Sequence, residues 1–205
     1  MYNTLISRLQ SIGINIYIWP VPVEMENPLP FLQNQSPLNY NPIYANNFLR
    51  ILTQTNRVFQ QFRSNFIGKC SPIHFFWRSF DLALTRFSGR KAPLHPPVPN
   101  NKLSVVREAY SHEVSSCGFW PGSAGSIQEP VFYSYSYPEP AEYKKFNIQQ
   151  SQAFYSKEIG EFILPYDVIK NSKNPDKDLM TFLNSTYNAA AITGHWDRTT
   201  LERLI

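Results

Sequence analysis

Side chains capable of chemistry gather between Ser71 and Gly122, where ionisable residues are interleaved with aromatic ones. The acid–base, ligating or nucleophilic candidates in and beside this stretch are Cys70, His74, Asp81, Arg86, Arg90, His112, Glu113 and Cys117. Such groups are costly to bury without partners, so their concentration favours a site over a purely structural core. They form no HExxH, GxSxG, Walker, GxGxxG or paired CxxC signature, so they specify no reaction.

Two segments are predicted to be strands that bring polar side chains together. Alternation over 79–87 places Asp81 and Thr85 on one face. In 110–116, Glu113 shares a face with Ser111 and Ser115. If the two strands pair in matching register, hydroxyls and two carboxylates meet, which suits a polar or cationic small molecule. The same alternation also fits a plain solvent-facing sheet surface.

The leading hypothesis is therefore binding of a polar small molecule in a cleft lined by residues 71–90 and 110–122. Its expected contacts are Asp81, Arg86, Arg90, His112 and Glu113. The two arginines flank Ser88-Gly89, a turn that suits an anion, because guanidinium groups bind phosphate or carboxylate through two hydrogen bonds. Structural ion pairs with Asp81, Glu108 or Glu113 explain these arginines equally well.

A metal-assisted or His-dependent hydrolase-like enzyme is the first alternative, with His74, His112 and Glu113 as weak metal candidates. Imidazole and carboxylate ligands suit zinc or iron. His112 and Glu113 are neighbours on a predicted strand, however, and should point to opposite faces. Cys117 beside a histidine would make a nucleophile, or else a small buried residue. The sequence leaves open whether the protein is an enzyme, and it indicates no particular cofactor.

A protein-interaction module is the second alternative. Val131, Tyr133, Tyr135 and Tyr137 form a stripe at period two, and tyrosine rings can stack on a partner chain. The proline- and asparagine-rich connection 21–44 would belong to the same surface. The stripe has a second explanation that needs no partner. Tyrosine favours strands, and its ring can be buried while its hydroxyl stays hydrated. The oligomeric state is not determined by the sequence.

Composition narrows the partners and the compartment. The chain of 205 residues has a formal net charge of +4, but its basic residues are scattered instead of forming one stripe, which disfavours nucleic acid. Ile14–Val23 is broken by Pro20 and Pro22, which argues against a signal or membrane segment. Two cysteines without an export signal are expected to be reduced thiols. These features predict a cytoplasmic protein without membrane contact.

Periodicity predicts one α+β domain over 1–205, with a mainly antiparallel sheet flanked by long amphipathic helices. The expected helices cover 2–12, 42–66 and 179–191, with Asn41 as N-cap of the second, and Thr199 with Glu202 as a capping box for a short last helix. The expected strands are 14–19, 79–87, 110–116, 131–137 and 161–164. Residues 91–104 are predicted to be a loop.

Long peptides of this chain resemble an uncharacterised bacterial family known only as a domain of unknown function. The strongest blocks are SPIHFFWRSFDLALTRFSGR and EAYSHEVSSCGFWPG, supported by INIYIWPVPVE, PVFYSYSYPEP and FLNSTYNAAA. The resemblance implies that this chain corresponds to the C-terminal portion of a longer architecture. Residues 1–44, the N-terminal helix, strand and connection, would then belong to an upstream segment. It implies no reaction, ligand or catalytic residue.

Overall fold

Six antiparallel strands form a single sheet in the order β1-β2-β3-β4-β6-β5. The computed structural model describes residues 2–22, 27–34, 40–77, 79–98, 101–123 and 127–203. The strands are β1 (His74–Phe76), β2 (Asp81–Lys91), β3 (His112–Trp120), β4 (Val131–Tyr137), β5 (Phe154–Ser156) and β6 (Glu161–Pro165). The predicted α+β class with a mainly antiparallel sheet is confirmed.

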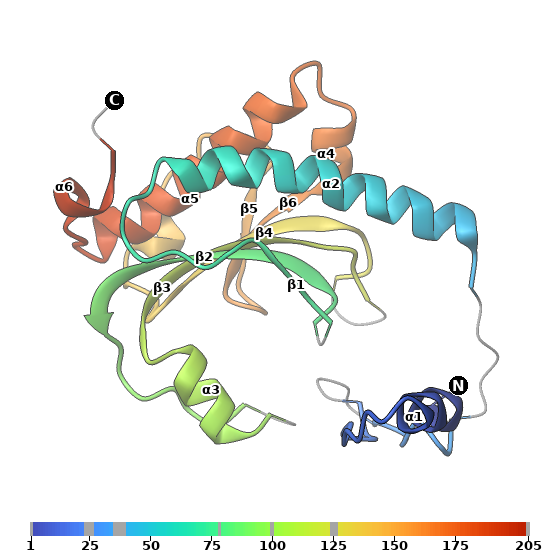
Figure 1. Cartoon of the computed structure of the whole chain (residues 1–205). Helices are drawn as coiled ribbons and strands as arrows, with labels where there is room; N and C mark the ends of the chain where they lie inside the picture. The colour runs from blue at the N-terminus through green and yellow to red at the C-terminus, as the bar shows by residue number, and fades with distance from the viewer. Residues whose placement is uncertain are drawn as a thin grey trace.

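Two long helices cover one face of this sheet (Figure 1). They are α2 (Pro42–Ser64) and α5 (Pro175–Thr193), and their apolar stripes pack on strand residues such as Leu84, Phe119 and Phe132. The predicted start of α2 is confirmed, since the Asn41 side chain accepts hydrogen bonds from the backbone N–H groups of Ile43 and Tyr44. Burial of these apolar surfaces fixes which face of each strand points toward the helices.

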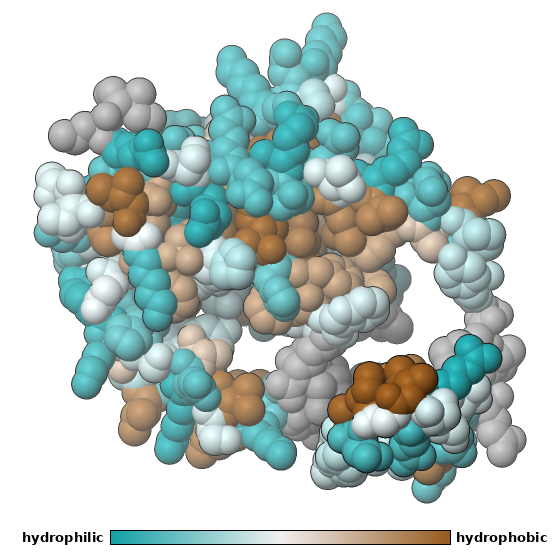
Figure 2. Space-filling model, in the orientation of Figure 1, coloured by the Kyte–Doolittle hydropathy of each residue, from teal (hydrophilic) through white to brown (hydrophobic). Residues whose placement is uncertain are grey.

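The opposite side of the sheet is called here the open face. Figure 1 shows the sheet curving around it, with α3 (Leu103–Ala109) and α1 (Tyr2–Ser11) on that side. The remaining helices are η1 (Tyr143–Lys145), α4 (Tyr166–Lys170) and α6 (Arg198–Leu201). No residue of α1 is buried, and Figure 2 shows hydrophobic side chains of the N-terminal segment turned toward the rest of the molecule. The part of the chain described here contains no helix long and apolar enough to span a membrane.

The predicted strand at 14–19 is wrong. Gly13 adopts φ +82° and ends α1, and the Ile14 N–H turns back to the Leu9 carbonyl. The residues after it are irregular, because no sheet edge lies beside them to complete their backbone hydrogen bonds. Of the expected irregular connection 21–44, residues 23–26 and 35–39 lie outside the described ranges.

Other differences occur where elements are short. The predicted loop 91–104 runs into α3, and β1, β5 and α4 were not expected. The capping box is also wrong, since Asp197 is the N-cap of α6 and the Thr199 hydroxyl donates to the Asp197 carboxylate at 2.7 Å. Elements of three to seven residues carry too little periodicity to be recognised without their tertiary partners.

Candidate functional site

The register between β2 and β3 separates the side chains that the sequence was expected to unite. Arg86 is paired with Ser115 and Thr85 with Ser116, so the expected meeting of Thr85 with Glu113 and Ser115 is wrong by one position. A shift of one residue moves a whole set of side chains to the other face of a sheet. Asp81 and Thr85 therefore lie on the open face, where the Thr85 and Ser116 hydroxyls are 2.9 Å apart.

Arg86 points the other way, under the helices. Its guanidinium donates to the Phe62 carbonyl and stacks 3.5 Å from the centre of the Phe62 ring and 4.3 Å from that of Tyr187. Burial lowers its pKa, and its Nε–H has no hydrogen-bond partner among the described residues. Arg86 is 3% exposed, so it belongs to the packing between α2, α5 and the sheet, where a ligand on the open face does not reach it.

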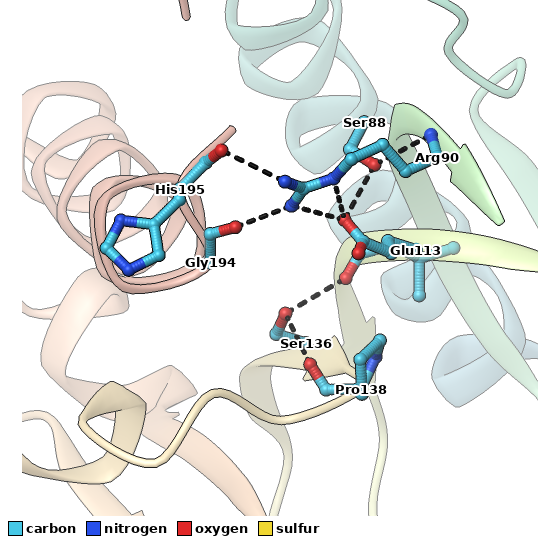
Figure 3. A network of polar contacts seen from close by, with 8 residues as sticks. Ser88, Arg90, Glu113, Ser136, Pro138, Gly194 and His195 are labelled. Atoms are coloured by element: carbon cyan, nitrogen blue, oxygen red, sulfur yellow. Dashed lines mark hydrogen bonds and ion pairs between the residues drawn. The ribbon is translucent and has the colours of Figure 1, made fainter. Parts of the chain in front are cut away.

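Arg90 and Glu113 form an ion pair at 2.7 Å, and the same arginine binds the end of α5 (Figure 3). Its guanidinium donates to the carbonyls of Gly194 and His195 as well as to the Glu113 carboxylate, which also accepts from the Ser88 hydroxyl. These residues are called here the arginine clamp. A cation at the carbonyl end of a helix is favourable, and here it ties α5 to β2 and β3.

A small cavity of about 180 Å³ lies beside the clamp. Its walls are formed by Glu113, Ser136, Tyr137, Pro138, Pro140, Gly194 and Trp196. Ser136 donates to the carbonyl of Val114 at 3.1 Å, and Figure 3 shows its hydroxyl beside the Pro138 carbonyl as well. The volume is below the range of roughly 300–1,000 Å³ that encloses most small ligands, and the polar groups of the clamp already bind one another.

The weak metal candidates are not brought together. His74 is paired with Ala83 and His112 with Lys91, near opposite ends of β2. Positions 83 and 91 are roughly 26 Å apart along a strand that rises about 3.3 Å per residue. His112 contacts the Ser111 hydroxyl at 3.1 Å. Within the described ranges, no three His, Cys, Asp or Glu residues are grouped as metal ligands.

Cys117 is buried in the core. Burial raises the pKa of its thiol to about 12, and the thiol donates to the Leu84 carbonyl at 3.7 Å. A thiol in this state is a poor nucleophile at neutral pH. Burial also raises the pKa of Cys70, although the positive charges of Arg86 and Arg63 oppose the shift.

A different constellation lies on the open face, where the hydroxyl of Tyr133 donates to Oδ2 of Asp81. Tyr133 on β4 is paired with Gly118 on β3, which is in turn paired with Ala83 on β2. A Cβ atom on Gly118 would lie 2.4 Å from the end of the Tyr133 ring, so the ring crosses β3 directly over this glycine. The absence of a side chain at position 118 therefore lets a tyrosine on β4 reach a carboxylate on β2.

Asp81 is incompletely satisfied. It is only 6% exposed, and its Oδ1 is buried without a hydrogen-bond partner among the described residues. Burial raises the pKa of its carboxyl, although the hydroxyls of Tyr133 and Ser79 oppose the shift. Buried polar atoms in native proteins are nearly always hydrogen-bonded, so an exception calls for an explanation.

Glu161 is a second carboxyl on the same face whose charged form is disfavoured. It shares this face with Ile163, which is paired with Tyr133. Burial raises the pKa of Glu161 to about 7, and the negative charge of Asp81 adds to the shift. No salt bridge compensates either carboxylate in the described part of the chain. Both acids therefore lie in a setting that disfavours their charged forms.

Aromatic rings surround these acids. The rings of Tyr133 and Tyr135 are stacked with centres 6.2 Å apart, and the Tyr135 hydroxyl is 3.1 Å from that of Tyr110. Burial raises the pKa of both Tyr133 and Tyr135 well above the ordinary value, so their hydroxyls remain protonated. Phe76, paired with Asp81 and 45% exposed, borders the group. Asp81, Thr85, Ser116, Tyr133, Tyr135 and Glu161 are called here the acid–tyrosine surface.

Sequence reasoning identified part of this surface. Alternation along the chain puts Asp81 and Thr85 on one face and the tyrosines in one stripe, but neither pattern links the two groups or points to Glu161. The available signal was the alternation of Glu161 and Ile163 in a predicted strand. Nothing in that alternation indicated that this strand would neighbour β4.

Another cavity, of about 730 Å³, lies away from both groups. It is lined mainly by exposed amide and hydroxyl side chains of residues 149–152 and of the loop between α4 and α5. Its polar groups bond within the chain, since Ser172 donates to Asp178 and accepts from the Asn174 N–H. It lacks the buried, unsatisfied groups that distinguish the acid–tyrosine surface.

The fold is an α+β layer whose helices cover one face of the sheet and whose open face carries acids and tyrosines. The model of a family of unknown function, DUF5996, matches residues 1–203, and the chain belongs to this family. No match was found among the curated proteins or the solved structures.

Proposed function

We propose that this protein binds a polar small molecule on the acid–tyrosine surface. The observation that carries the proposal is Oδ1 of Asp81, a buried carboxylate oxygen without a partner at hydrogen-bond distance and angle in the described chain, although the Ser79 hydroxyl is near enough to oppose the rise in the pKa of this carboxyl. A buried acceptor without a partner lowers the stability of the fold by about 1–3 kcal/mol, and a charged acceptor lowers it by more. A ligand that donates a hydrogen bond to this oxygen would remove the loss. Of the contacts expected from sequence, Asp81 is retained. Arg86, Arg90 and Glu113 have structural partners of their own, and His112 is paired with Lys91 at the other end of β2.

The supply of hydrogen-bonding groups supports a polar ligand. Tyr133 holds Asp81 in place, and the paired hydroxyls of Thr85 and Ser116 follow on the same face. Tyrosine rings add flat apolar area beside these groups, which is a common composition of small-molecule sites.

A screen of polar metabolite-like compounds by ligand-observed NMR tests the proposal. We expect at least one compound to bind the wild-type protein and to lose binding in Asp81→Asn and Tyr133→Phe. A matched control is Glu142→Gln, which alters an exposed carboxylate paired with Lys145 outside this surface. Binding that persists in both surface variants, or no binding by any compound, would refute the proposal.

A second candidate function is protein interaction through the N-terminal segment. Its observation is the exposure of large apolar side chains on a segment whose helix α1 buries no residue. They include Leu5, Ile12, Ile14, Ile16, Trp19, Leu29, Phe31 and Leu32. Clustered exposed apolar side chains mark contact surfaces. Light scattering after size-exclusion chromatography tests this, because self-association should weaken when Ile16 and Leu32 are replaced by serine.

A further inference from the structure

We propose that the ligand of the acid–tyrosine surface is an organic cation, a protonated amine with at least one N–H group. This inference rests on the proposed function and names the chemical class of its ligand. The ammonium would lie between the carboxylates of Asp81 and Glu161, donate to Oδ1 of Asp81, and pack its carbon chain on the neighbouring aromatic rings.

The charge of the surface supports a cation. Two carboxylates share the open face, and each pKa is raised with no contribution from a basic side chain of the described residues. The His95 ring lies against the rings of Tyr110 and Tyr137. A neutral ligand would leave the repulsion between the acids in place, and an anion would increase it. A cation removes it.

The unsatisfied oxygen supports an N–H donor in particular. Oδ2 of Asp81 already accepts from Tyr133, so the acceptor that remains is Oδ1. A quaternary ammonium carries charge but no N–H group, and it would leave this oxygen without a hydrogen bond. A primary or secondary ammonium supplies both the charge and the donor, and charge-assisted hydrogen bonds are the stronger kind.

The aromatic rings favour an organic cation over a metal ion. Tyr133 and Tyr135 present stacked rings, and Phe76 and Trp120 belong to the same face as Asp81. Rings attract organic cations through their electron-rich faces and shield alkyl groups from water. A metal ion needs more oxygen or nitrogen ligands than two acids offer, and the described residues contain no group of three.

Three four-carbon probes that differ in charge test the inference. Titrations of wild-type protein with n-butylammonium, 1-butanol and butanoate are followed by the NMR signals of the tryptophan indole N–H groups, and calcium is titrated separately. We expect n-butylammonium to bind at least roughly tenfold more tightly than 1-butanol, the value of one charge-assisted hydrogen bond. Butanoate and calcium should cause no saturable shift.

Variants assign the effect to the two acids. Asp81→Asn should lower the affinity for n-butylammonium by roughly tenfold or more and remove the preference over 1-butanol. Glu161→Gln should act in the same direction with a smaller loss. Glu142→Gln should bind as the wild type does. Circular dichroism checks that each variant is folded, and Tyr133→Phe provides a second probe of the same carboxylate if Asp81→Asn does not fold.

The outcomes separate this inference from the function on which it rests. If a neutral polar compound from the screen binds through Asp81 while n-butylammonium does not, the small-molecule function stands and the cation is refuted. Equal binding of n-butylammonium and 1-butanol, or an ammonium preference that survives in Asp81→Asn, also overturns it. Saturable binding of calcium through the two acids would replace the organic cation by a metal ion. If nothing binds, both proposals fail.

Discussion

The arginine clamp and the acid–tyrosine surface use carboxylates in opposite ways. In the clamp, Glu113 forms an ion pair with Arg90, and the same arginine donates to the carbonyls of Gly194 and His195, directly after α5. On the open face, Asp81 accepts from Tyr133 and raises the pKa of Glu161, and no salt bridge of the described residues compensates either acid. A carboxylate with complete partners stabilises a fold, whereas one without them costs stability. The difference distinguishes residues that hold the sheet to its helices from residues that the proposed ligand would contact.

Closing the space above Gly118 should have the largest effect on stability. Gly118→Ala places a methyl group 2.4 Å from the Tyr133 ring, so the ring must move away from Asp81. We expect the free energy of unfolding to fall by about 3 kcal/mol, measured by urea denaturation. Shortening the tyrosine should relieve the clash, so Gly118→Ala with Tyr133→Ala should lose less than the sum of the single losses. Additive losses would show that the two residues do not oppose one another.

The pH dependence of stability should differ between the two regions. Glu161 has its pKa raised from 4.5 to about 7, so the folded state holds a proton that the unfolded state releases between these values. The contribution of this group to the free energy of unfolding is therefore largest below about pH 4.5, and it falls by about 3 kcal/mol as the pH rises to about 7. The raised pKa of Asp81 acts in the same direction.

Glu161→Gln should remove most of this slope in urea denaturation at pH 5 to 8. Glu142→Gln, at an exposed carboxylate, should retain it. If the free energy of unfolding changed equally with pH in the two variants, Glu161 would not be held protonated on the open face.

Removing the arginine of the clamp should lower the free energy of unfolding by about 1.5 kcal/mol. Arg90→Ala leaves Glu113, 18% exposed, without its cation and frees two carbonyls at the end of α5. The matched control is Arg57→Ala, whose ion pair with Asp176 is about half exposed on both sides and should therefore cost clearly less than the clamp. Thermal unfolding of the two variants compares them directly, and equal losses would reduce the clamp to an ordinary surface ion pair.

Asp81→Asn should stabilise the protein by about 1 kcal/mol, the smallest of these effects and the one with the opposite sign. The amide keeps an acceptor for Tyr133 and removes a buried charge. Glu113→Gln at the clamp should instead lower stability. Unfolding midpoints in urea measure both, and a destabilised Asp81→Asn would place Asp81 among the structural residues.

Local sequence patterns predict the long helices and the positions of Asp81 and Thr85 on one face of β2. The helical stripes of α2 and α5, the Asn41 cap and the alternation in β2 follow from rules that concern neighbours along the chain. Alternation also implies that Asp81 and Arg86, five positions apart, point to opposite faces. Their separation was therefore available from the sequence, although both were assigned to one cleft.

The other features of the site depend on which strands pair and in which register, and neighbouring residues along the chain do not indicate this pairing. The register of Thr85 with Ser116 decides which hydroxyls meet, and the placement of β6 beside β4 brings Glu161 to the tyrosines. The role of Gly118 depends on a residue fifteen positions later in the chain, because the ring that crosses it belongs to Tyr133. These relations arise from sheet assembly, which is fixed by packing against the helices.

The alternation of β2 has an electrical consequence. Asp81 directs negative charge to the open face, and Arg86 directs positive charge into the helical layer. The strand therefore carries a dipole along the sheet normal, with its negative end toward solvent. A charged molecule approaching the open face meets this field before it touches any side chain, so encounter rates for cations should fall as added salt shortens the range of the field.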